Sequence, residues 1–480
     1  MDRLPLTALD AISLPEEKNV RALLRDAPRA ALGKLVVLDD DPTGIQTVHD
    51  VPVYTDWERE TLLQGLREPG NLFFVLTNSR SFSREQTRQA HRQIGENLAW
   101  AAQQAGNGFT LISRSDSTLR GHYPLEMDTL RETLEEKLEI SYDGEIIMPY
   151  FSEGGRYTLD NVHYVQKGNV LIPAGQTEFA LDATFGYRSS DLAQWCQEKT
   201  QGQCPAESVV HISLRELRAV DVEGITQKLM AARNNTRYTV DAAYDRDAEV
   251  FAVALLRAIG AGKHFLFRSA AGLVRVLGNV ERRPLLTGRE LKNGEGPGLI
   301  LVGSHVQKTT EQLQTLLEAH PGLTAICFDV SQAVREEALL RERDRVLAQM
   351  ETAMEAGQTV VVYTSRKLIL AEDALPQDNL AISVRISQAL CSLVTLLRVR
   401  PGYLIAKGGI TSSDVGVKGL GVRRAWVLGQ LLPGVPVWRT GKESRFPGLA
   451  YVIFPGNVGE PDGLLQAVDR LESGEDVSAK

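Results

Sequence analysis

The chain repeats one pattern, in which a short apolar run is followed by a polar segment and then by helical spacing. Three runs in the first quarter follow it, at residues 35–38, 72–76 and 109–112, and each leads directly into a polar segment. Runs this short and this apolar are typical of strands buried in a parallel sheet. Because the carboxyl ends of neighbouring parallel strands meet at one crevice, the polar segments are expected to share a binding site.

The same alternation covers most of the remaining chain. Further strands are expected at residues 209–212, 238–242, 264–267, 299–302, 324–330, 359–363 and 403–406. Helical spacing predicts helices at residues 83–105, 310–319, 335–356 and 381–397, and another that follows residue 414 and continues to Leu431. Residues 143–190 fit neither period and predict an irregular or antiparallel excursion.

A segment of linker composition divides the alternation in two. Residues 279–297 are rich in charged residues, Gly and Pro. We therefore predict an α/β protein, with two α/β lobes that have mainly parallel sheets and a ligand cleft between them. The expected domains are residues 1–285 and 295–480, and residues 1–33 are expected to form a polar helical lead-in.

The overall charge limits the kinds of binding partner that are expected. The 480 residues include 53 Lys and Arg against 61 Asp and Glu, which gives a formal net charge of −8. A broad surface for nucleic acid or an anionic membrane is not expected on this balance, and no apolar run approaches the roughly 18 residues that a membrane span needs. The amino-terminal segment lacks the order of a signal peptide. We expect a soluble cytoplasmic protein, and a homo-oligomer is compatible with the sequence.

Metal and disulfide chemistry have little support in the sequence. The four cysteines show no C-x-x-C spacing, and the eight histidines include no H-x-x-x-H pair. A disulfide framework and a zinc site are therefore both unexpected, and no residue is assigned as a metal ligand.

Three consecutive acids, Asp39, Asp40 and Asp41, follow the first predicted strand. They could accept hydrogen bonds from a polyol, act as a base or bind a metal, and they would also suit a solvated helix N-terminus. Together with Thr43 they imitate the aspartate-nucleophile loop of haloacid-dehalogenase-like phosphatases, whose chemistry needs a further acidic pair for magnesium. The chain contains no other adjacent Asp pair. We favour a ligand-binding role and keep the phosphatase as an alternative.

Arginines occupy the polar segments that follow the second and third strands. Arg80 follows the strand at 72–76, whereas Arg114 and Arg120 follow the strand at 109–112. A guanidinium group binds a carboxylate through two parallel hydrogen bonds, so a set of arginines at one crevice suits an acidic metabolite. Each arginine could equally pair with a neighbouring Asp.

A glycine-containing loop in the second half suits an anion. The residues Lys407-Gly408-Gly409-Ile410-Thr411-Ser412-Ser413-Asp414 follow a predicted strand and open a predicted helix, so backbone N–H groups would surround a phosphate, although a plain helix cap would look similar. The spacing is not that of a Walker A loop. Gly303-Ser304 and Pro455-Gly456-Asn457 follow two other strands of this half. Three such loops leave room for a nucleotide.

Several of these motifs together resemble the four-carbon acid sugar kinase family, formerly a domain of unknown function, whose members phosphorylate threonate, erythronate and oxo-tetronates with ATP. The resemblance covers nearly the whole chain. It rests on the segments Asp40-Asp41-Pro42-Thr43-Gly44, Thr77-Asn78-Ser79-Arg80, Ser115-Asp116-Ser117-Thr118-Leu119-Arg120-Gly121, Gly155-Arg156, Gly303-Ser304, Lys407-Gly408-Gly409-Ile410-Thr411-Ser412 and Phe454-Pro455-Gly456-Asn457.

The resemblance implies an acid-sugar-binding N-terminal domain and a nucleotide-binding C-terminal domain. The residues that it implies for the sugar acid are Asp40, Arg80, Arg114, Ser115, Asp116 and Ser117. Those that it implies for ATP are Ser304, Gly408, Gly409, Ile410, Thr411 and Gly456. The expected partners are a small sugar acid and ATP with Mg²⁺, in carbohydrate catabolism.

The sequence departs from the family beside the expected substrate site. Arg114 stands where many members have Lys, and His122-Tyr123-Pro124 follows Arg120-Gly121 where they continue with Asn. A branched acid such as 3-oxo-isoapionate is therefore a rival to a linear tetronate. Asp414, beside the expected phosphate loop, is the candidate catalytic base, with Asp40 or Asp41 as alternatives. A non-catalytic sugar-acid sensor is the alternative from another class.

Overall fold

The chain folds into two compact units, each with its own α/β core. The computed structural model describes residues 1–41, 44–291, 296–365, 376–456 and 458–473. Unit 1 consists of Met1–Thr47 and Asp56–Arg282, and unit 2 consists of Val48–Thr55 and Arg283–Lys480. The short segment Val48–Thr55 therefore belongs to the second unit, which nothing in the local sequence indicates.

Unit 1 is built on seven parallel strands in the order β10-β11-β6-β12-β5-β2-β4. The strands are β2 (Lys34–Asp39), β4 (Leu72–Leu76), β5 (Phe109–Arg114), β6 (Gly144–Met148), β10 (Val210–Ile212), β11 (Thr236–Val240) and β12 (Phe265–Ser269). The register sets Asp39 of β2 beside both Leu76 of β4 and Arg114 of β5. The strands that precede the predicted polar segments are thus neighbours and end at one level, as the sequence predicted.

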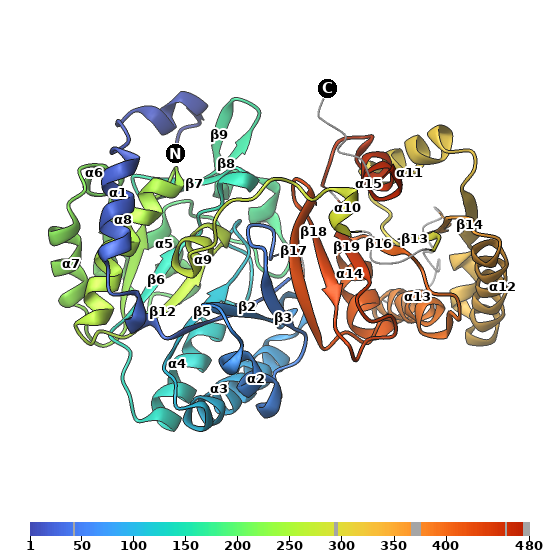
Figure 1. Cartoon of the computed structure of the whole chain (residues 1–480). Coiled ribbons are helices and arrows are strands. Elements are labelled where there is room, and N and C mark those ends of the chain that lie inside the picture. The colour runs from blue at the N-terminus through green and yellow to red at the C-terminus, as the bar shows by residue number, and fades with distance from the viewer. Residues whose placement is uncertain (42–43, 292–295, 366–375, 457, 474–480) are drawn as a thin grey trace. The chain divides into compact units, whose positions relative to one another are not determined.

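Helices cover both faces of this sheet. They are α1 (Glu17–Asp26), α2 (Arg59–Arg67), α3 (Arg84–Ala105), α4 (Leu125–Leu138), α5 (Leu192–Lys199), α6 (Leu214–Arg218), α7 (Val222–Met230), α8 (Asp245–Gly260) and α9 (Ala271–Gly278). Figure 1 shows α2, α3 and α4 grouped on one side of β2 and β5, and α1 and α8 on the other. The long helix α3 begins at a capping box between Ser83 and Gln86 and ends at Gly106, which has a φ of +67°.

An antiparallel sheet interrupts the parallel alternation of unit 1. It has the order β1-β9-β8-β7 and consists of β1 (Leu4–Pro5), β7 (Arg156–Leu159), β8 (Val162–Lys167) and β9 (Val170–Pro173). The irregular or antiparallel excursion predicted for residues 143–190 is therefore confirmed only in part, because its first residues form β6, a parallel strand of the main sheet that the sequence analysis missed. The amino-terminal segment supplies α1 as expected, but it also supplies the edge strand β1.

Unit 2 combines five parallel strands with an antiparallel extension, in the order β3-β17-β18-β19-β16-β13-β15-β14. The strands are β3 (Val51–Tyr54), β13 (Gly298–Val302), β14 (Thr324–Phe328), β15 (Val360–Thr364), β16 (Tyr403–Lys407), β17 (Arg424–Leu432), β18 (Val435–Thr440) and β19 (Ala450–Phe454). The helices are α10 (Gly288–Leu291), α11 (Gln307–Ala319), α12 (Glu336–Glu355), α13 (Pro376–Leu396), α14 (Gly409–Asp414) and α15 (Gly463–Ser473).

The predicted helix up to Leu431 is wrong. Helix α14 ends at Asp414, a π-helical turn covers Val415–Gly419, and β17 then pairs with β18 through a turn at Gly434, whose φ is +78°. Along β17, buried and half-buried residues alternate with a period of two, which is the pattern of a strand. No described helix is long and apolar enough to cross a membrane.

Candidate functional site

The carboxyl edge of the unit 1 sheet gathers the acids and arginines that the sequence singled out. Asp39 ends β2, Arg114 ends β5, and Arg80 lies in the 3₁₀ turn Ser79–Ser81 after β4. Arg114 Nη1 lies 3.3 Å from Asp39 Oδ1 and 3.9 Å from Asp40 Oδ1. Pro42 and Thr43, which the sequence includes in the same motif, lie outside the described residues.

Arg80 is the centre of this charge cluster. Its guanidinium group lies 3.2 Å from Asp40 Oδ2, 2.5 Å from Asp41 Oδ2 and 3.8 Å from Asp116 Oδ1. Asn78, in the left-handed region with a φ of +54°, turns the chain sharply between β4 and Arg80. The attraction of the surrounding acids outweighs burial and raises the pKa of Arg80, so its charge is permanent.

The segment after β5 brings Ser115, Asp116 and Ser117 to the same edge. The backbone N–H of Asp116 donates to Asp40 Oδ2 over 3.2 Å, and the Asp116 carboxylate accepts hydrogen bonds from Arg120 Nε and the Thr118 hydroxyl. Burial tends to raise the pKa of Asp116, but Arg80 and Arg120 outweigh it and hold the pKa below its usual range. Asp116 is therefore a fixed anion that orients arginines.

Asp39 and Asp40 differ from Asp116 in their electrostatics. Burial raises the pKa of Asp39 to about 7 against the attraction of Arg114, and it raises the pKa of Asp40 to about 6 against Arg80 and Arg114. Oδ2 of Asp39 and Oδ1 of Asp40 are buried and accept no hydrogen bond from a described residue. Carboxylates with an unbonded oxygen and a pKa near neutrality suit proton acceptance from a hydroxyl group.

Two further charged residues support this edge, and the sequence analysis missed both. Arg268 is the next-to-last residue of β12. It donates to Ser115 Oγ and to the carbonyl oxygen of Arg120, each over 3.0 Å, and lies 3.7 Å from Glu126 Oε2. Glu126, in the first turn of α4, accepts a 2.7 Å hydrogen bond from Ser79 Oγ. These contacts link β12 and α4 to the loops that follow β4 and β5. Arg268 directly follows the strand predicted at residues 264–267, and this position is the signal by which the sequence could have identified it.

The predicted nucleotide residues lie at the carboxyl ends of three adjacent strands of unit 2. The register aligns Val302 of β13, Lys407 of β16 and Phe454 of β19, and Ser304, Gly408 and Gly456 follow those strand ends. The Thr309 hydroxyl donates to the carbonyl oxygen of Gly456 over 2.8 Å and lies 3.2 Å from Ser304 Oγ. The loops are thus bonded to one another. Asn457 lies outside the described residues.

The loop after β16 requires glycine where it turns. Gly408 has a φ of +126°, and a Cβ there would lie 3.0 Å from Ser304 Cβ and 3.2 Å from Thr411 Oγ1. A Cβ at Gly456 would lie 2.8 Å from Ser304 Oγ. The next residues, Gly409 and Ile410, are exposed. The three loops therefore approach each other closely while exposed backbone remains beside them, an arrangement that fits a phosphate group.

The side chain of Lys407, at the end of β16, contacts the loop that follows β19. Its buried ammonium group donates to the carbonyl oxygen of Pro455 over 2.7 Å, lies 3.5 Å from those of Gly456 and Val458, and sits 3.8 Å from the centre of the Phe454 ring. Burial lowers the pKa of Lys407 to about 7. The sequence includes Lys407 in its motif without assigning it a role.

Asp414, the predicted base, is engaged elsewhere. It ends α14, where one carboxylate oxygen lies 2.8 Å from Lys418 Nζ and the other accepts a hydrogen bond from Ser387 of α13. Both oxygens thus have partners of their own. Asp40, one of the alternatives left open by the sequence, has instead an oxygen that accepts no hydrogen bond from a described residue.

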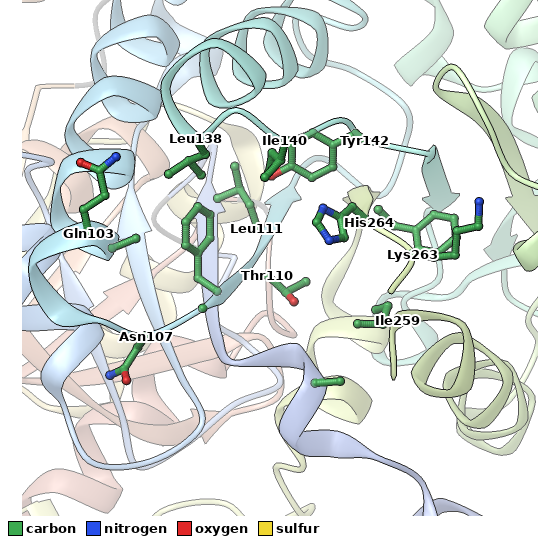
Figure 2. Close-up of a pocket in the computed structure, with 15 residues that line it drawn as sticks. Gln103, Asn107, Thr110, Leu111, Leu138, Ile140, Tyr142, Ile259, Lys263 and His264 are labelled. Carbon is green, nitrogen blue, oxygen red and sulfur yellow. The ribbon is translucent and has the colours of Figure 1, made fainter. Parts of the chain in front are cut away.

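A cavity of about 430 Å³ lies at the opposite, amino edge of the unit 1 sheet. Figure 2 shows Leu111, Ile140 and Tyr142 around it, together with Lys263. The ammonium group of Lys263 is held by Asp143 Oδ1 and the carbonyl oxygen of Ala232, at 2.8 and 2.7 Å. The lining is mainly apolar and contains none of the predicted site residues, so this cavity does not match a polar, anionic ligand.

Two protein-family models match the chain. A sugar-binding N-terminal domain matches residues 35–277, and a nucleotide-binding C-terminal domain matches residues 299–464. A 3-oxo-tetronate kinase of Cupriavidus necator is 30% identical over 182 residues, which are 37% of this chain and 39% of that protein. The match therefore spans about two fifths of the curated relative's length.

Two solved structures share the fold. A Salmonella typhimurium LT2 protein provisionally described as a tRNA synthase superimposes with a TM-score of 0.65 at 17% identity, over 90% of this chain and 98% of its own. A Haemophilus influenzae protein from a domain family of unknown function superimposes with a TM-score of 0.62 at 18% identity, over 91% of this chain and 100% of its own. At these identities the likeness concerns the fold alone.

Proposed function

Because the chain belongs to the four-carbon acid sugar kinase family, we propose that it transfers the γ-phosphoryl group of ATP to a hydroxyl group of a small sugar acid. The observation that supports this most directly is the cluster at the carboxyl edge of unit 1. There Asp40 has an unbonded, buried carboxylate oxygen and a pKa of about 6, beside the fixed charges of Arg80 and Arg114.

In the proposed reaction, Asp40 is the base. Its Oδ1 accepts the proton of the substrate hydroxyl while the hydroxyl oxygen forms a bond to the γ-phosphorus and the bond from that phosphorus to the leaving oxygen of ADP breaks. Arg80 and Arg114 keep enough of Asp40 ionised at neutral pH despite burial, and Ser115 and Ser117 offer hydroxyl groups to the polyol.

The glycine loops of unit 2 are proposed to hold ATP. Backbone N–H groups around Gly408–Thr411, with Ser304 and Gly456, would bind the phosphates and stabilise charge on the transferring group. Magnesium supplies charge neutralisation in such reactions. The ion is commonly held by the phosphates of ATP together with one or two protein carboxylates.

The proposed substrates are tetronates, oxo-tetronates and related acids such as 3-oxo-isoapionate. The haloacid-dehalogenase-like alternative has less support, because the acids that would serve as nucleophile and metal ligands face Arg80 and Arg114. An ADP-release assay over a panel of these acids tests the proposal. ADP release that depends on one acid is the expected result. Phosphate release from a phosphorylated acid without ATP would indicate the phosphatase, and binding without turnover on any acid would indicate the sensor.

A further inference from the structure

One arginine at the unit 1 site differs from Arg80, Arg114 and Arg120, because its guanidinium group has no hydrogen-bond or ion-pair partner among the described residues. Arg156, the first residue of β7, is half-buried; its side chain makes no hydrogen bond or ion pair with any described residue, and its Nε atom is buried. Arg80, Arg114 and Arg120 all lie against carboxylates. A guanidinium group that is largely removed from water without a partner is costly, unless a ligand supplies the missing charge.

The surroundings of Arg156 place it beside the charge cluster. Burial lowers its pKa, and Asp116 and Arg120 are the next largest influences on that pKa. The ring of Phe179 faces both guanidinium groups, with Arg156 at 5.5 Å and Arg120 at 5.1 Å from its centre. The other carboxylate that acts on Arg156 is that of Glu178, which pairs with Lys167 at 2.7 Å; the neutral Tyr187 hydroxyl donates to the carbonyl oxygen of Thr118.

The balance of charge at the site separates two functions among its arginines. Five carboxylates, those of Asp39, Asp40, Asp41, Asp116 and Asp182, face Arg80, Arg114 and Arg120. A substrate carboxylate bound to Arg80 or Arg114 would therefore lie beside like charges. Asp116 and Glu178 attract Arg156 from a distance, but no described carboxylate lies within ion-pair distance of its donors, and the Phe179 ring limits access of water on one side.

We infer that Arg156 is the anchor for the carboxylate of the sugar acid, and that the ring of Phe179 forms one wall of that subsite. This rests on the proposed function and deepens it, because it sets the direction in which the substrate lies. The carboxylate faces the antiparallel sheet that carries Arg156, and the hydroxyl groups face Asp39 and Asp40 on the parallel sheet. The site then selects acids over neutral polyols of equal length.

Binding measurements test the inference separately from catalysis. Calorimetry with threonate, and with the neutral polyol threitol, is carried out on the full chain and on Arg156→Gln, Arg156→Lys and the control Arg188→Gln, which changes an exposed arginine. Arg156→Gln should weaken threonate binding by about 30- to 100-fold, as expected for loss of a charge-assisted, two-point contact. Arg156→Lys should weaken it by about tenfold, because it keeps the charge and loses the planar fork. Threitol and ADP affinities should not change.

The outcomes are distinguishable from failure of the proposed function. If the wild type binds threonate without phosphorylating any acid, the kinase proposal fails while the binding series still judges Arg156. Threonate affinity of Arg156→Gln within about twofold of wild type, or an equal loss for threitol and threonate, would overturn the anchor. So would a wild type that binds threitol as tightly as threonate. ADP affinity and thermal unfolding report on folding, and Phe179→Leu, expected to weaken threonate binding by a few fold, gives a second test if Arg156→Gln does not fold.

Discussion

Asp40 is expected to set the acid limb of the pH dependence of turnover. Burial raises its pKa to about 6. A carboxyl group with that pKa is about 90% ionised at pH 7 and about 10% ionised at pH 5, so kcat/KM for the sugar acid should fall about tenfold between these values. A carboxyl group with an ordinary pKa near 4 would stay about 90% ionised at pH 5, and the same assay would show almost no change.

Two substitutions test the physical cause of this limb. Arg80→Met removes the larger of the two positive influences on Asp40, so the pKa should rise and the acid limb should move to higher pH by about one unit. Asp40→Asn keeps the shape of the side chain but cannot accept the proton. It should lower kcat by about 10²- to 10⁴-fold while ADP binding to unit 2 is unchanged.

The assay is coupled ADP release from pH 5 to pH 8.5, with the coupling enzymes in excess at every pH. The position of the limb is taken from kcat/KM, which reports the free enzyme. The reasoning is refuted if Asp40→Asn keeps turnover within about threefold of wild type, or if Arg80→Met leaves the limb where it was. A limb that persists unchanged in Asp40→Asn would assign it to another group.

Three other positions give sharp expectations. Gly408→Ala forces a φ of +126° on a residue with a Cβ and should weaken ADP binding in calorimetry about tenfold. Gly409→Ala, whose Cβ would meet nothing within 4 Å, should bind ADP as tightly as wild type. Equal effects of the two substitutions would contradict the proposal that the turn at Gly408 shapes the nucleotide site. Lys407→Met removes a buried donor from the nucleotide loops and should lower the free energy of unfolding by about 1–3 kcal/mol. An unchanged denaturation midpoint would contradict this expectation. Asp414→Asn should keep turnover within about threefold, and a loss beyond about 100-fold with ADP binding intact would restore it as the base.

The sequence predicted the part of the site that depends on strand ends. Buried parallel strands are encoded by short apolar runs, and their carboxyl ends lie at one edge of the sheet, so the sequence alone predicts that Asp40, Arg80 and Arg114 lie together. The same reasoning failed after Asp414, where β17 pairs with β3 from the other end of the chain. The turn at Gly434 is a local signal of the β17–β18 hairpin that the sequence analysis missed, whereas nothing local indicates a strand partner some 370 residues away in sequence.

Ion pairing at the site is decided by tertiary structure, and it changes which arginines can bind a ligand. In the sequence, Arg80, Arg114 and Arg120 look equivalent as carboxylate clamps. In the fold, each is neutralised by aspartates, while the side chain of Arg156, which enters from an antiparallel insertion with no strand-end signal, forms no hydrogen bond or ion pair with any described residue. The site therefore has two unlike ends. At one end, Arg80 and Arg114 keep a buried acid, Asp40, ionised; at the other, Arg156 offers a positive charge that no described carboxylate pairs with. A molecule with a carboxylate at one end and hydroxyl groups at the other matches both.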